Sequence, residues 1–246
     1  MRKILLVLII VGFFVVGKVS ASEKRPRFVD VGLVAAPSLN WGAVSTLNYK
    51  STGLRIGGMY AVMVDINLAK TSSNYYFSTG IGGRHLMFGY KCKDKYYIPL
   101  QDKTDVDLKS KQANVYLFLP TTFKMKTNPF GRFIIFGQVG LEHAILLSAK
   151  SKDEILKADG STMSFDKVER YKQTSIIREA LIVTAGIEFV IKDRTKATAA
   201  ISYNYGFNNI FRKKYINQYW GNDAEGNPYR VKDFGHVLEL QIGFIF

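Results

Sequence analysis

LRIGGMYAVMVDINL, at residues 54–68, alternates strictly between two kinds of side chain. One series is apolar or glycine and consists of Leu54, Ile56, Gly58, Tyr60, Val62, Val64, Ile66 and Leu68. The series between them includes Arg55, Asp65 and Asn67. Because successive side chains of a strand point to opposite faces, this period of two predicts a β-strand with one apolar face and one mixed face.

The same alternation recurs along the whole chain. It predicts further strands near residues 27–36, 75–89, 114–126, 132–148, 177–191, 196–209 and 237–246, which makes eight in total. One face of each strand carries Leu, Ile, Val, Phe and Tyr, and the other mixes small residues with scattered charges. Such strands suit a transmembrane barrel with an apolar outside. They also suit a soluble carrier barrel with an apolar lumen.

The lengths of the connections decide between these two barrels. Short connections at 69–74, 127–131 and 192–195 alternate with long ones at 37–52, 90–113, 149–176 and 210–234. Bacterial outer-membrane barrels have short periplasmic turns and long external loops, and a closed barrel leaves no unpaired backbone edge in lipid. The sequence therefore predicts an all-β fold, an eight-stranded antiparallel up-and-down transmembrane β-barrel with short periplasmic turns and long extracellular loops.

The N-terminus predicts export. Arg2 and Lys3 precede the apolar run 4–16, and the small residues Ser20 and Ala21 follow it, as in a secretory signal peptide. The run is shorter than the roughly 20 apolar residues of a spanning helix. We therefore expect a cleaved signal peptide at 1–21 and an outer-membrane barrel at 22–246. No second long apolar run follows, which excludes a helical membrane protein.

The net charge is +14. In an exported protein, anionic lipid headgroups and lipopolysaccharide are more plausible counter-charges than nucleic acid. Cys92 is the only cysteine, so an internal disulfide and a two-cysteine metal site are excluded. The histidines His85, His143 and His236 are too scattered to predict a metal site, and no cofactor is expected.

The last strand ends on an apolar series that includes Phe244 and the terminal Phe246. Together with the alternation and the signal peptide, this end is typical of the targeting strand that the barrel-assembly machinery recognises. We therefore expect that machinery to be a partner of the chain.

Several segments resemble the PorT-like family, which carries the outer membrane protein β-barrel domain. They include Tyr116–Pro120 with Lys124–Thr127, Phe136–Gly140, Leu147–Lys150, Ala185–Phe189, Ser202–Ile210 and the closing strand. The resemblance covers most of the chain from residue 54 onward, and it departs at Phe118, where family strands commonly carry Glu. It implies the barrel fold and, as a function, a component of the type IX secretion and gliding machinery with envelope secretion proteins as partners.

The mixed face predicts a charged lumen that contains Arg55, Asp65, Arg84, Lys124, Glu142, Arg178, Glu188 and Glu239. The interior of an eight-stranded barrel is just wide enough for side chains, and buried charges persist when they are paired. A packed salt-bridge network is therefore favoured over a proton or ion pathway.

Basic residues cluster at the predicted periplasmic turns, namely Lys70, Lys126, Arg132, Lys192, Arg194 and Lys196. They predict a basic collar whose long side chains reach phospholipid headgroups. The alternative is a docking surface for a periplasmic partner.

No catalytic residues are predicted. No serine lies two residues beyond any histidine, and Glu142 and His143 are neighbours that must point to opposite faces of a sheet. The sequence therefore favours a membrane-embedded structural or secretion-associated component. A surface binder that acts through its loops, where Trp220 could anchor a partner, is the alternative. A lipid-modifying enzyme is the third candidate.

Overall fold

A computed structural model describes residues 28–44, 49–69, 74–96, 104–156, 160–192, 195–212 and 232–246. They form antiparallel strands: β1 (Val29–Val44), β2 (Tyr49–Ser51), β3 (Arg55–Asn67), β4 (Tyr75–Tyr96), β5 (Thr104–Lys126), β6 (Phe133–Leu156), β7 (Thr162–Glu169), β8 (Ile177–Lys192), β9 (Thr195–Asn209) and β10 (Asp233–Ile245). Within these residues, no helix is long and apolar enough to cross a membrane. The predicted signal peptide, Lys70, Arg194 and Trp220 lie outside the described residues.

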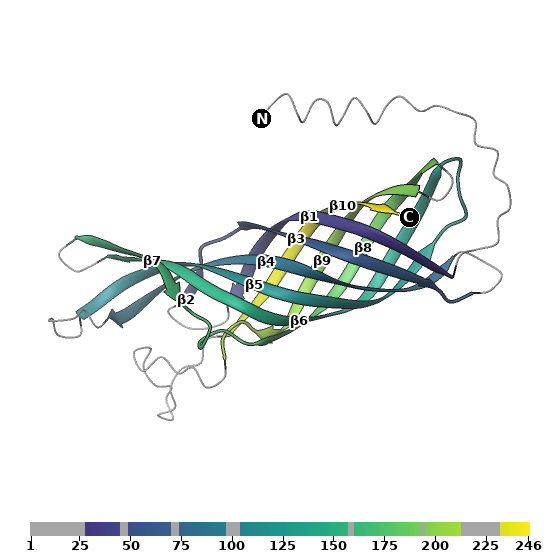
Figure 1. Cartoon of the computed structure of the whole chain (residues 1–246). Helices are drawn as coiled ribbons and strands as arrows, with labels where there is room; N and C mark the ends of the chain where they lie inside the picture. Colours follow the sequence, from purple (N-terminus) through teal and green to yellow (C-terminus); the bar gives the residue numbers. More distant parts are fainter. Residues whose placement is uncertain are drawn as a thin grey trace, which may run out of the picture.

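Eight of the strands close into a barrel, as the alternation predicted (Figure 1). Their order around it is β4, β3, β1, β10, β9, β8, β6 and β5, and β5 pairs with β4 again. The first and last barrel strands close the sheet, with Gly32 opposite Ile245 and Val44 opposite Asp233. The short strands β2 and β7 lie outside this circle, where β2 pairs with β4 and β7 pairs with β6.

The apolar face points outward, which confirms the transmembrane orientation of the sheet. Leu33, Ile56 and Leu240 are each more than half exposed, at 55%, 72% and 56%. The alternate side chains are buried in the lumen, and they include Asp65 and Glu239. A sheet with this apolar outer surface suits lipid, whereas a soluble carrier barrel has its apolar face inside.

The strands are longer than predicted at one end of the barrel. We call this the loop end, and the end with the short connections 69–74, 127–131 and 192–195 the turn end. β4 and β5 continue to the pair Tyr96–Thr104, and β6 continues to Leu156 and carries β7 along its edge. This sheet extension, residues 89–96, 104–113 and 148–156 with β2 and β7, projects beyond the barrel (Figure 1).

The predicted loops 37–52, 90–113 and 149–176 are therefore largely strand, and this part of the sequence prediction is wrong. The outer face of the extension carries lysines, such as Lys91 and Lys111, in place of apolar residues. Backbone pairing continues there because cross-strand hydrogen bonds need no apolar outer face. The period-two apolar signal fades where the sheet leaves the region that lipid covers.

Candidate functional site

The turn end of the lumen holds one cluster of ion pairs. Lys124 and Lys126 of β5 both bind Glu188 of β8, each with an Nζ–Oε1 distance of 2.9 Å. Lys124 also lies 2.8 Å from Asp65 Oδ2, and Lys196 lies 3.4 Å from Glu188 Oε2. We call this the turn-end cluster: Asp30, Asp65, Lys124, Lys126, Glu188 and Lys196. Three lysines face three carboxylates, so the cluster is neutral as a unit.

Neighbouring side chains hold the turn-end cluster in place. Ser78 donates its hydroxyl to Asp65 Oδ1 at 2.6 Å. The ammonium groups of Lys124 and Lys126 lie over the rings of Phe136 and Tyr76, at 4.4 and 4.2 Å from the ring centres. These contacts supply partners on several sides of each charge, which a buried ion pair needs to offset its desolvation.

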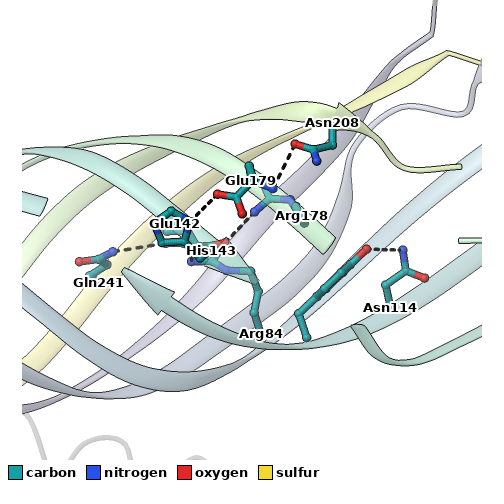
Figure 2. Close-up of polar contacts among 10 residues, drawn as sticks. Arg84, Asn114, Glu142, His143, Arg178, Glu179, Asn208 and Gln241 are labelled. Atoms are coloured by element: carbon teal, nitrogen blue, oxygen red, sulfur yellow. Dashed lines mark hydrogen bonds and ion pairs between the residues drawn. The ribbon is translucent and has the colours of Figure 1, made fainter. Parts of the chain in front are cut away.

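A second cluster lies farther along the lumen (Figure 2). Arg84 of β4 donates to Glu142 Oε2 of β6 at 2.7 Å and also binds Glu239 of β10. Arg178 of β8 donates to the other oxygen of Glu142 at 2.6 Å. We call Arg84, Glu142, Arg178 and Glu239 the central quartet. Arg84 links β4 to β6 and β10, which are not its neighbours in the sheet, whereas Arg178 and Glu142 lie on the neighbouring strands β8 and β6. The quartet therefore braces the barrel wall across the lumen.

A small cavity separates the two clusters. Its volume is about 60 Å³, and its lining includes Asp65, Lys124, Arg84, Glu142 and the buried amide of Asn204. A space of this size admits water but no larger solute. Within the described part of the chain, the charged groups on both sides of the cavity are locked in ion pairs that cross the lumen, so the arrangement resembles a filled barrel.

An apolar layer closes the lumen on the loop side of the central quartet. It consists of Tyr49, Leu86, Phe88, Tyr90, Tyr116, Leu146, Phe211 and Val237, all buried. The rings of Tyr49 and Tyr90 stack at 4.8 Å, and Phe211 meets both edge-on. Burial raises the pKa of the Tyr49 hydroxyl on β2, which therefore stays neutral. The buried amides of Asn40, Asn114 and Gln112 lie opposite Val237, Leu86 and Phe88, so the layer is mainly but not wholly apolar.

The segment 170–176 folds over the opening at the loop end. Arg170 binds Asp153 of β6 and donates to Ser151 Oγ at 2.9 Å. Thr174 accepts a hydrogen bond from Gln112 of β5 at 2.8 Å and is fully buried. The sequence predicts an external loop here, and alternation does not reveal these contacts because residues far apart in the chain make them.

The structure places all but one of the predicted lumen charges in the two clusters. Seven of the eight predicted lumen charges lie in the two clusters, and they are Asp65, Arg84, Lys124, Glu142, Arg178, Glu188 and Glu239. Arg55 is the exception. It lies at the loop end of β3, and its guanidinium donates to Thr52 Oγ1 at 2.8 Å.

The predicted basic collar is wrong for Lys126 and Lys196. Both side chains point into the lumen, with exposures of 1% and 17%, and both bind Glu188. Lys126 is two residues from the inward Lys124, and Lys196 is two residues from the inward Thr198. Because side chains two residues apart on a strand point to the same face, the alternation itself predicts that both lysines point inward. Arg132 and Lys192 remain at the surface of the turn end. The outward side chains of Phe244 and Phe246 are both 51% exposed.

All three histidines face outward. His143 Nδ1 lies 2.5 Å from Glu179 Oε2, and its Nε2 lies 3.1 Å from Thr121 Oγ1, whereas the neighbouring Glu142 is buried in the lumen (Figure 2). The order hydroxyl, imidazole, carboxylate is that of an activated nucleophile. However, β5 pairs with β4 on one side of Thr121 and with β6 on the other. The backbone N–H groups beside Thr121 are thus used in the sheet, and acyl transfer needs donors free to bind an oxyanion.

His236 belongs to an outward aromatic group. Its ring stacks on Trp41 at 5.4 Å, and its Nδ1 lies 2.7 Å from the Tyr203 hydroxyl. Amphipathic aromatic side chains of this kind collect where a membrane meets water. We therefore expect this group to lie at the membrane boundary on the loop side of the barrel.

Comparisons with known proteins give the family of the chain. Among solved structures, it is similar to Neisserial surface protein A, with 13% identity, a TM-score of 0.40 and coverage of 89% of this chain and 96% of that one. It is also similar to OprG from Pseudomonas aeruginosa, with 12% identity, a TM-score of 0.37 and coverage of 90% and 98%. The attachment invasion locus protein Ail of Yersinia pestis has 10% identity, a TM-score of 0.29 and coverage of 88% and 98%.

No curated protein matches the sequence. The sequence profile described as "Outer membrane protein beta-barrel domain" matches residues 23–212, which is most of the chain. This match agrees with the closed barrel and its apolar outer face. The chain therefore belongs to the outer membrane protein beta-barrel domain family.

Proposed function

We propose that this protein is a non-enzymatic outer-membrane barrel with a sealed lumen, and that it presents a rigid β-sheet outside the membrane for recognition. The observation that carries the proposal is the sheet extension. β4 and β5 keep one register from the turn-end pair Tyr75–Met125 to the pair Tyr96–Thr104, with a gap in the pairing only beside Pro120. The extension is therefore continuous with the barrel wall, and a rigid scaffold that carries an exposed surface is suited to binding.

The contents of the lumen support recognition over transport. The turn-end cluster, the central quartet and the apolar layer follow one another along the barrel axis. Each contains large buried side chains, such as Arg84, Tyr116 and Leu146. A solute would have to break several buried ion pairs and then cross the apolar layer. Activity is therefore expected at the two ends of the barrel rather than inside it.

The experiment that tests the proposal removes the outer part of the sheet extension and leaves the barrel intact. In the trimmed variant, residues 93–107 and 152–167 are each replaced by Asn-Gly. The first replacement joins Cys92 to Leu108, which already lie opposite each other, and Asn-Gly is the preferred two-residue hairpin turn. Folding is checked by the shift in gel mobility on heating that intact barrels show.

Affinity purification from gently solubilised outer membranes then compares the wild type, the trimmed variant and a turn-end variant. We expect co-purifying components to be lost with the sheet extension and kept in the variant Arg132→Glu, Lys192→Glu. The reverse result would contradict recognition through the extension. It would favour the second candidate, a PorT-like secretion component that docks through the turn end, where Arg132 and Lys192 lie at the surface.

A further inference from the structure

The outward face of the sheet extension carries an unusual row of lysines. Lys50 of β2 lies opposite Lys91 of β4, and Lys91 lies opposite Lys109 of β5. The row ends at Glu154 of β6, which is opposite Lys109. A second row, closer to the barrel, places Lys111 opposite Lys152. Like charges directly opposite each other on one face of a sheet are destabilising, so these rows call for a counter-charge.

The protein supplies only part of that counter-charge. Glu154 lies 3.4 Å from the Lys109 ammonium and 3.2 Å from that of Lys111, so one carboxylate serves two lysines. Lys152 pairs with the exposed Asp166 at 3.1 Å. Within the described ranges, neither Lys50 nor Lys91 has a carboxylate within ion-pair distance, and both are exposed. The end of the row nearest β2 is therefore free to bind an anion.

A groove of about 580 Å³ lies along this row. It is lined by Lys50, Lys91, Cys92, Asp107, Leu108, Lys109, Glu154, Leu156 and Thr162. The groove combines the ammonium groups of three lysines with two carboxylates, those of Asp107 and Glu154, and with apolar and hydroxyl-bearing side chains. Its lysines outnumber its carboxylates by one, and its volume is in the range of small-molecule sites. It can hold a phosphorylated sugar but is far too open to enclose a whole lipid.

The same face is continuous with the surface that lipid covers. Toward the turn end, the outward positions that follow the lysines are Gly89 and Met87 on β4 and Ala113, Val115 and Leu117 on β5, and Met87 and Leu117 are 38% and 40% exposed. On β6 they are Leu147 and Ile145, which are more than half exposed. The lysine rows thus begin where the apolar band ends, at the depth where lipid headgroups lie.

We propose that this groove binds the phosphate groups of an outer-leaflet glycolipid of the lipopolysaccharide type. Lys50, Lys91 and Lys109 would bind the phosphate, and the acyl chains would lie along the apolar face that includes Met87, Leu117 and Leu147. An acidic protein would use the lysines but not the adjoining apolar face, so the combination favours an amphiphile. The proposal is independent of recognition through the rest of the extension and of its partners.

The test measures the binding of lipid A to the purified full-length protein in detergent micelles by native mass spectrometry. The key variant is Lys50→Glu, Lys91→Glu, because it changes the two lysines without a carboxylate partner. Each basic residue near an anionic surface contributes about fivefold to binding, so we expect the double variant to bind at least about tenfold more weakly. Dephosphorylated lipid A should bind the wild type as weakly as lipid A binds this variant.

The matched control is Lys172→Glu, Lys232→Glu, which makes the same change in net charge at exposed positions outside the groove lining. It should bind lipid A like the wild type. If Lys50→Glu, Lys91→Glu lowers the folded fraction, the neutral variant Lys50→Gln, Lys91→Gln replaces it, with an expected loss of several-fold. Equal binding by the groove variant and the wild type, equal loss in the control, or equal binding of the dephosphorylated lipid would overturn the proposal.

Discussion

Arg84 reaches across the lumen from β4 to Glu142 on β6, and its Nη2 lies 2.7 Å from Glu142 Oε2. The same guanidinium binds Glu239 on β10, so one side chain links three strands of the barrel wall. Arg84 and Glu142 are both buried, and each has a second charged partner, Glu239 for Arg84 and Arg178 for Glu142. The central quartet is therefore a structural tie whose energy can be measured.

The first prediction concerns Arg84. Arg84→Met leaves Glu239 without a basic partner in the quartet and Glu142 with only Arg178. Removing one partner of a buried pair typically costs about 3–5 kcal/mol, so we expect a loss of this size in the free energy of unfolding. Urea titration of the refolded barrel in lipid vesicles measures it. In the double variant Arg84→Met, Glu239→Leu, part of the loss should be recovered. Equal free energies of unfolding for Arg84→Met and the wild type would show that the ion pairs of Arg84 do not stabilise the barrel.

The second prediction concerns Glu188, which faces three lysines in the turn-end cluster. Glu188→Gln leaves Lys126 and Lys196 short of counter-charge, and we expect a loss of about 3 kcal/mol in the same titration. The matched control is Asp166→Asn, which breaks the exposed pair with Lys152. Exposed pairs contribute about 0–1 kcal/mol, so the control should unfold almost like the wild type. Similar losses in the two variants would argue against a buried network.

The third prediction concerns orientation. Lys172 lies at the loop end and Lys192 at the turn end, and both are exposed. In a Cys92→Ser background, we expect Lys172→Cys to react with a membrane-impermeant maleimide on intact cells. Lys192→Cys should react only after the outer membrane is opened. Labelling of Lys192→Cys alone on intact cells would reverse the orientation of the barrel.

The fourth prediction concerns the depth of Trp41, which stacks on His236 at the outer surface. In a Trp220→Phe background, Trp41 is the only tryptophan. We expect lipids brominated near the headgroup to quench its emission more strongly than lipids brominated near the chain ends. Stronger quenching by the deep bromines would place this aromatic group inside the hydrocarbon core instead.

The sequence predicted the part of the fold that lipid controls. Residues 54–68 alternate because one face of β3 meets lipid and the other meets the lumen, and this requirement acts on every residue in turn. It ceases to act on the sheet extension, where Lys91 and Lys111 are outward residues in water. The alternation therefore predicted the barrel strands, but it placed the ends of β1, β4 and β6 too early and the start of β5 too late.

The candidate site was predicted as a set of residues but not as an arrangement. The alternation of side chains along the strands predicted that Arg84 and Glu188 point into the lumen. The same rule, applied to Lys126 and Lys196, excludes both from the predicted collar. The division into two clusters depends on the register between strands, which alternation does not determine. The apolar layer was missed because Tyr49 and Phe211 reach it from outside the regular barrel strands.

The central claim is that the lumen is sealed, and conductance across a planar bilayer tests it most directly. The purified full-length protein is inserted into the bilayer, with a sixteen-stranded porin as the open control. We predict no steady current above the background of the empty bilayer, because the turn-end cluster, the central quartet and the apolar layer fill the barrel. Large, steady open channels from the wild type would contradict this account.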